Sequence, residues 1–138
     1  MLTVKIKYAP GVKPIVQAHP GEHYDIRSAE SVVFSPGDTV KIKHGFCMEL
    51  PPGYEAKIEP RSSTFDKYGL IHVDSGVIDN DWRSEWCSTF YATRYGMVRK
   101  NARVAQFRFQ RIQEKAELET VDFIEDTGRG GYGSTGEE

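Results

Sequence analysis

The stretch Tyr54-Glu55-Ala56-Lys57-Ile58-Glu59 alternates apolar and charged side chains. Successive side chains of a β-strand point to opposite faces of the sheet, so this period of two predicts a strand with one buried face. The same alternation recurs over residues 2–8, 40–43 and 104–109. Turn-forming residues separate these runs at 36–38, 51–53 and 80–81. Short strands with frequent turns predict an all-β sandwich or barrel.

The chain is long enough for one domain with one hydrophobic core, at 138 residues. Residues 113–119 fit a short helix, a polar strand or a loop equally well. Residues 128–136 hold five glycines, and such a composition cannot bury enough surface to fold alone. We therefore predict a core domain of residues 1–122 and a flexible Gly-rich C-terminal arm of residues 123–138.

Charge and cysteine content exclude several classes of protein. The net charge of −2 gives no basic surface for nucleic acid. Cys47 and Cys87 have neither the number nor the spacing of a disulfide framework or a zinc site. The N-terminal residues lack the apolar core of a signal peptide, and no stretch reaches the roughly 20 apolar residues of a membrane span. We therefore expect a cytoplasmic protein that binds neither nucleic acid nor membrane.

Two segments have the composition of an anion site. The Gly-rich tail nearly matches a phosphate-binding P-loop, but it lacks the lysine. Its backbone N–H groups, Arg129, and the hydroxyls of Ser134 and Thr135 could still bind phosphate, and Tyr132 could stack on a base. Residues 60–67 also combine positive charge with hydroxyl groups. On composition alone, however, the tail is more typical of a frayed chain end than of a phosphate site. The second segment is equally typical of a polar loop.

Residues 76–85 form a third candidate segment. Asn80-Asp81 predicts a hairpin turn, which would bring two carboxylates and Trp82 together at its tip. A carboxylate at that position could act as a general base or lie near a metal ion. An ordinary polar turn has the same composition. His19 and His23 lie four residues apart, but no helix is predicted that would bring them together around a metal.

In order and spacing, the candidate segments resemble the trimeric dUTPase family, whose members share five motifs. The motifs correspond to residues 23–29, 60–70, 76–85, 103–106 and 129–136. The resemblance implies a dUTPase-like β jelly roll (β-clip) that assembles as a homotrimer. It also implies shared active sites, with the first, second and fourth motifs from one subunit, the third from another and the fifth from the remaining one. The Gly-rich arm would then close over a neighbour's nucleotide.

The resemblance further implies a dUTP diphosphatase, in which water attacks the α-phosphate of dUTP and releases dUMP and pyrophosphate. This activity limits uracil incorporation into DNA and supplies dUMP for dTMP synthesis. Asp79 would be the catalytic base, and Asp25 would bind the Mg²⁺ cofactor through water. The implied substrate-binding residues are Arg61, Ser62, Ser63, Gly76, Val77, Ile78, Trp82, Gln106, Arg129, Tyr132, Gly133, Ser134 and Thr135.

Several positions depart from the family pattern. Trp82 stands where the family usually has Tyr under the deoxyribose, and Tyr132 where it usually has Phe over the base. Ser84 replaces a common Gly, and Glu22-His23 replaces a common Ala-Gly. Residues 86–95 resemble a subgroup found in phages and some bacteria.

Two alternatives share the implied fold. One is a relative of the dCTP deaminases, but the complete Gly-rich arm and the Gly-Val-Ile-Asp stretch fit hydrolysis of dUTP better. A nucleotide-responsive binding protein with a regulatory protein partner is compatible with the same residues.

Overall fold

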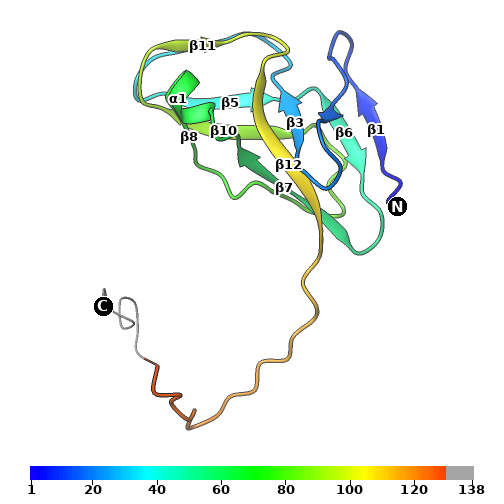
Figure 1. The fold of residues 1–138 in the computed structure, drawn as a ribbon, viewed down its shortest axis with the longest axis vertical. Coiled ribbons are helices and arrows are strands. Elements are labelled where there is room, and N and C mark those ends of the chain that lie inside the picture. The colour runs from blue at the N-terminus through cyan, green and yellow to red at the C-terminus, as the bar shows by residue number, and fades with distance from the viewer. Residues whose placement is uncertain (130–138) are drawn as a thin grey trace.

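The computed structural model describes residues 1–129, which form an almost all-β fold (Figure 1). The strands are β1 (Lys5–Tyr8), β2 (Val16–Gln17), β3 (Tyr24–Arg27), β4 (Val32–Phe34), β5 (Thr39–Lys43), β6 (Phe46–Glu49), β7 (Tyr54–Pro60), β8 (Leu70–His72), β9 (Val77–Ile78), β10 (Cys87–Ala92), β11 (Gly96–Val98) and β12 (Arg103–Arg111). One short helix, α1 (Thr64–Tyr68), lies among these residues. The predicted all-β class is confirmed.

The largest sheet has the strand order β2-β3-β12-β7-β9. Its long strand β12 lies between β3 and β7 and pairs antiparallel with both (Figure 1). The smaller sheets are β5-β10-β8, β1-β6 and β4-β11. Because β3, β12 and β7 are neighbours, side chains from three distant parts of the sequence reach the same face of one sheet.

Alternation along β7 separates a buried from a polar face, as predicted. Ala56 and Ile58 are buried, whereas Lys57 and Glu59 are partly exposed. At the centre of the core, the Trp86 ring lies 5.0 Å from the rings of both Phe46 and Phe107. Such aromatic side chains bury large apolar areas and contribute strongly to stability.

The first strand is shorter than the alternation over residues 2–8 predicts. It begins at Lys5, which pairs with Glu49 of β6, and Leu2 is exposed. Extending the pairing would place the start of the chain opposite Pro51 and Pro52. Proline has no N–H to donate to a ladder, so the strand cannot continue there.

Residues after β12 leave the body of the fold. Residues 112–129 have no regular secondary structure and run away from the sheets (Figure 1), which excludes a helix or strand at 113–119 in this structure. They carry large apolar side chains in water: Leu118 is 92%, Phe123 80% and Ile124 82% exposed.

No helix within residues 1–129 is long and apolar enough to cross a membrane.

His44 is fully buried between two strands. Its Nδ1 lies 2.8 Å from the Arg27 carbonyl oxygen, and its Nε2 lies 2.7 Å from the Ser88 hydroxyl. A carbonyl only accepts hydrogen bonds, so Nδ1 donates to Arg27 and Nε2 accepts from Ser88 in the neutral ring. Burial lowers the pKa of His44 from 6.5 to about 4, against the opposing effect of the Arg27 hydrogen bond.

Stability is expected to fall as the pH drops from about 6.5 towards 4. The unfolded chain, with the higher pKa at His44, binds more protons over this range, so acid favours unfolding. The full loss from this residue is about 3 kcal/mol, at 1.36 kcal/mol per pKa unit. Urea denaturation at pH 7.0, 5.5 and 4.5 measures this loss of unfolding free energy in the wild type, in His44→Gln and in His19→Gln. His44→Gln should show a smaller loss than wild type and than the exposed control His19→Gln; equal losses would contradict the assignment.

Candidate active site

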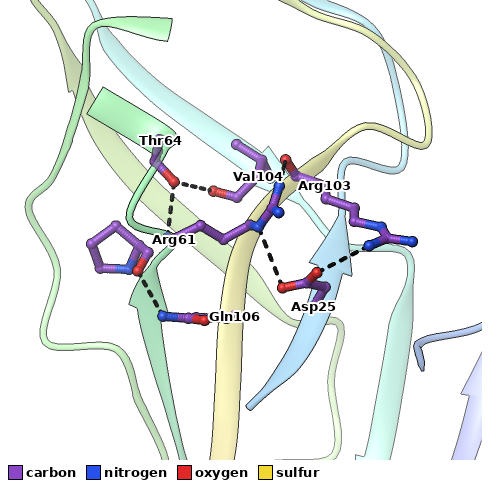
Figure 2. Close-up of polar contacts among 7 residues, drawn as sticks. Asp25, Arg61, Thr64, Arg103, Val104 and Gln106 are labelled. Carbon is purple, nitrogen blue, oxygen red and sulfur yellow. Dashed lines mark hydrogen bonds and ion pairs between the residues drawn. The ribbon is translucent and has the colours of Figure 1, made fainter. Parts of the chain in front are cut away.

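Asp25 lies between two arginines on the polar face of the largest sheet (Figure 2). Its Oδ1 is 3.3 Å from Arg61 Nε, and its Oδ2 is 3.3 Å from Arg103 Nη1. Arg61 Nη1 also donates to the Arg103 carbonyl oxygen at 3.3 Å. One carboxylate therefore faces two guanidinium groups, which leaves an excess positive charge at a partly exposed site. Such a site favours an anionic ligand, and the arginine forks suit phosphate oxygens.

Thr64 connects the arginine-bearing turn to β12. Its Oγ1 accepts from the Arg61 backbone N–H at 2.9 Å and donates to the Val104 carbonyl oxygen at 3.1 Å (Figure 2). Thr64 is buried, so both hydrogen bonds are shielded from water. Ser62 is exposed, and Ser63 precedes α1 without a side-chain cap hydrogen bond. Both hydroxyls therefore remain available beside Arg61.

Gln106 lies opposite Asp25 on one side and opposite Glu59 on the other. Its Nε2 donates to the Pro60 carbonyl oxygen at 3.1 Å (Figure 2). The β3–β12 register shifts between Arg103 and Ala105, and such a bulge changes the direction of nearby side chains. The sheet thus brings Asp25, Arg61 and Gln106 together, from the first, second and fourth motifs.

The third motif lies along the other side of β7. Val77 and Ile78 pair with Lys57 and Ala56, and Asp79 follows at the end of β9. Asp79 is exposed, and its carbonyl oxygen accepts from the Trp82 N–H at 3.0 Å. Trp82 is 47% exposed. A cavity of about 450 Å³ adjoins this segment and is lined by Lys41, Lys43, Val77, Ile78, Asp79, Trp82, Ser84, Glu85 and Cys87.

The predicted hairpin at Asn80-Asp81 is not formed. Strand β9 pairs with β7, whereas β10 pairs with β5 and β8. The segment between β9 and β10 instead passes from one sheet to another. The turn prediction itself holds locally, because the Trp82–Asp79 backbone hydrogen bond closes a tight turn.

Asp79 and Arg61 lie at opposite ends of β7. Since Ile78 is opposite Ala56, Asp79 is level with Glu55, six positions before Arg61. At roughly 3.3 Å per residue, about 20 Å of strand separates these two levels. Within one chain, the predicted site residues therefore form two separate groups.

The predicted fifth-motif residues are placed only at their beginning. Arg129 is exposed at the end of the described part of the chain. Tyr132, Gly133, Ser134 and Thr135 lie outside the described residues.

Comparison with protein families gives a match to the dUTPase family over residues 17–136. This chain belongs to the dUTPase family. The dUTPase family relatives include the SPbeta prophage-derived deoxyuridine 5'-triphosphate nucleotidohydrolase of Bacillus subtilis, which is 36% identical over 98% of this chain and 99% of its own length. The deoxyuridine 5'-triphosphate nucleotidohydrolase of Paramecium bursaria Chlorella virus 1 is 35% identical, covering 98% and 97%. The predicted resemblance to dUTPases of phage and bacterial type is confirmed.

Solved phage dUTPases share the fold of this dUTPase family member. A dUTPase of Staphylococcus bacteriophage 80alpha, solved with dUpNHpp, superposes with a TM-score of 0.79 at 22% identity, covering 97% of this chain and 98% of that one. The dUTPase of Staphylococcus aureus phage phi11, described with a structural Mg(II) ion, gives 0.76 at 19%, covering 88% and 97%. The predicted dUTPase-like jelly roll is confirmed.

Sequence reasoning on this dUTPase missed contacts that link its motifs. Arg103 was assigned no role, yet it forms an ion pair with Asp25. His23 Nε2 lies 3.0 Å from Glu59 Oε2, although His23 directly precedes β3 and Glu59 lies near the end of β7. Neither contact has a signal in the sequence, because each depends on the β3-β12-β7 strand order.

Within residues 1–129, no three His, Cys, Asp or Glu side chains group to hold a metal ion.

Proposed function

We propose that this chain hydrolyses dUTP to dUMP and pyrophosphate. The observation that carries the proposal is the positively charged Asp25–Arg61–Arg103 cluster beside Gln106, built from motifs of a family that residues 17–136 match. The curated relatives are named deoxyuridine 5'-triphosphate nucleotidohydrolases, which supports the same substrate here.

The triphosphate is proposed to bind at the arginine cluster. Arg61 offers a charged fork, Ser62 and Ser63 offer hydroxyl donors, and Gln106 offers an amide. Asp25 orients both arginines and neutralises one of their charges, so that the site remains attractive to phosphate. Residues of the fifth motif, Arg129, Tyr132, Gly133, Ser134 and Thr135, are proposed to complete the site, with the arm of residues 123–138 closing over the nucleotide.

Uracil and deoxyribose are proposed to bind at the third motif. Backbone groups of Gly76, Val77 and Ile78 would hydrogen-bond the base, which rejects cytosine because its donors and acceptors are mismatched. Trp82 would pack under the deoxyribose. Its exposed ring lies at the wall of the cavity beside β9, which supports this assignment.

Asp79 is proposed to act as the general base. Its carboxylate accepts a proton from a water molecule while orienting that water in line with the α-phosphorus. The water oxygen bonds to the α-phosphorus, and the bond from the α-phosphorus to its bridging oxygen breaks. The electron pair leaves with pyrophosphate. The Asp79 side chain is exposed in the single chain, so water can reach its carboxylate.

Magnesium fits the site only through the substrate and water. Both carboxylate oxygens of Asp25 face arginine nitrogens, so this residue is suited to orient water of hydration more than to bind the ion directly. Mg²⁺ keeps several waters and prefers phosphate oxygens, which agrees with such a donor set. When bound, the ion would neutralise charge that develops on the phosphates.

A homotrimer with shared active sites is proposed from the separation of these two groups of site residues. The attacked phosphorus lies about 3–3.5 Å from the attacking oxygen in a reactive complex. The roughly 20 Å of strand β7 between Asp79 and Arg61 favours a site in which these two residues come from different chains. A third motif from a second copy would complete the phosphate site. The exposed Leu118, Phe123 and Ile124 of the C-terminal segment also favour burial against another copy.

Pyrophosphate release from dUTP, dCTP, dTTP and UTP tests the proposed function. We expect release from dUTP alone, and a decrease of about 100-fold or more when Mg²⁺ is chelated, because a metal ion contributes several kcal/mol of charge stabilisation. Ammonia release from dCTP would instead favour the deaminase relative. Absence of turnover of all four nucleotides by folded protein would overturn the enzymatic function.

A further inference from the structure

Two side chains fix the ends of the segment that carries Asp79. The segment comprises residues 76–79, between β8 on one sheet and the turn before β10. Asp74 lies just before it and Asn80 just after it. Both side chains form hydrogen bonds to the backbone of other strands or loops, and we call them the two clamps.

The Asp74 clamp joins the segment to the β5-β10-β8 sheet. Its Oδ2 accepts from the Thr89 backbone N–H at 2.6 Å, and its Oδ1 accepts from the Gly76 N–H at 2.9 Å. His72 Nε2 lies 2.6 Å from Oδ1, and the His72 ring is tilted against Phe90. The carboxylate thus takes the place of a backbone acceptor opposite the β10 N–H, and it fixes the point where the chain that continues from β8 leaves the edge of β10.

The Asn80 clamp joins the other end to the start of β7 and to the loop before it. Its Nδ2 donates to the carbonyl oxygens of Pro51 and Tyr54, each at 2.8 Å. Both amide hydrogens are therefore used, and Asn80 is partly buried. An unpaired buried polar group would cost stability, so this geometry specifies a side-chain amide.

Between the clamps, three kinds of contact hold the segment: backbone pairing with β7, a Val77 N–H to Ser75 Oγ hydrogen bond at 3.4 Å, and packing of Ile78 against the core. The Ile58 N–H donates to the Gly76 carbonyl oxygen at 2.7 Å, and Val77 and Ile78 pair with β7. No side-chain hydrogen bond of Asp79 is present within residues 1–129. The position of the Asp79 carboxylate is therefore determined by its backbone, and the backbone is determined at each end by a clamp.

We propose that Asp74 and Asn80 are positioning residues for catalysis and base selection. The inference rests on the proposed function, in which Asp79 directs water and the backbone of residues 76–78 contacts uracil. A displacement of about 1 Å in a catalytic group reduces the rate by about 100-fold. The clamps act through the segment and do not contact the nucleotide.

Isosteric variants test the clamps without changing side-chain volume. Asp74→Asn turns an amide N–H₂ towards a backbone N–H, and Asn80→Asp turns a carboxylate towards two carbonyl oxygens. The matched control is Asp38→Asn, since Asp38 Oδ2 also accepts a backbone N–H, that of Ser35 at 2.8 Å, in the remote turn between β4 and β5. The measurements are kcat and KM for dUTP and dTTP, the thermal midpoint, and amide hydrogen exchange over residues 73–81.

Each clamp variant is expected to lower kcat for dUTP by about 10- to 100-fold. The ratio of kcat/KM for dUTP over dTTP should fall by about tenfold or more, because the uracil-reading backbone moves as well. The control should retain wild-type kcat and selectivity. A role in stability alone would lower the thermal midpoint but leave the selectivity ratio unchanged.

Hydrogen exchange separates failure of the clamps from failure of the proposed function. Exchange over residues 73–81 should rise in the clamp variants and stay unchanged in β12, whatever reaction the protein catalyses. If exchange and selectivity both match wild type, the positioning role is overturned while dUTP hydrolysis stands. If wild-type protein does not turn over dUTP, exchange alone decides whether the clamps hold the segment, and unchanged exchange overturns the inference.

Discussion

Asp79→Asn is expected to abolish most dUTP hydrolysis, with kcat reduced by roughly 10²- to 10⁴-fold, the contribution of a well-placed general base. The amide has nearly the size of the carboxylate but cannot accept the proton of the attacking water. The Asp79 side chain is exposed and forms no hydrogen bond in the described residues, so its replacement should leave the fold intact. KM for dUTP should change little, because Asp79 is proposed to contact the water and not the nucleotide.

Steady-state kinetics and a thermal melt of Asp79→Asn measure these effects. Asp66→Asn is the control, since Asp66 is an exposed carboxylate in the first turn of α1, near the phosphate site but outside it. The control should retain wild-type kcat. Wild-type kcat in Asp79→Asn would sink the assignment of the general base and direct attention to other carboxylates near β9.

Gly76→Ala is expected to give the largest loss of stability, on the order of 3 kcal/mol, together with loss of activity. Gly76 has φ +74°, a conformation that disfavours any side chain. A Cβ at this position would lie 2.0 Å from the Ile58 carbonyl oxygen. The clash is with backbone, so either β7 or the segment of residues 76–79 must move. Movement of the segment displaces Asp79.

Gly37→Ala separates conformational strain from the clash. Gly37 has φ +89°, but an added Cβ would meet nothing within 4 Å. This control should therefore lose only about 1–2 kcal/mol, the cost of a left-handed conformation in a residue with a side chain. Urea denaturation of both variants gives the difference. Equal destabilisation would show that the contact with Ile58 contributes nothing, and would contradict the close approach of β9 to β7.

Binary patterning carried the prediction of the fold class. The alternation in β7 and β12 is visible because each strand has one buried and one polar face. Helix α1 was not predicted, since its five residues are too few to show a helical period. It depends on Thr64, whose buried hydroxyl accepts from the Arg61 N–H and donates to the carbonyl oxygen of Val104, 40 positions further along the chain.

The residues of the candidate site could be predicted from the sequence, but most of their contacts could not. Asp25, Arg61, Gln106 and Asp79 could be nominated from motif order, because the chemistry of phosphate and water requires these residue types. The ion pairs of Asp25 with both arginines could not be nominated, since they require β3, β12 and β7 to be neighbours. The roles of Asp74 and Asn80 as clamps could not be predicted from the sequence either, because their side chains contact residues of other elements.

The sequence by itself determined the all-β class, the family and the residue types available for chemistry, because these depend on local alternation and on motif order. Tertiary structure alone decided which residues meet. It placed Arg61 and Asp79 at opposite ends of β7, paired β9 with β7 instead of β10, and buried His44 between Arg27 and Ser88. These outcomes follow from strand order and register, and contacts between distant residues leave no periodic signal along the chain.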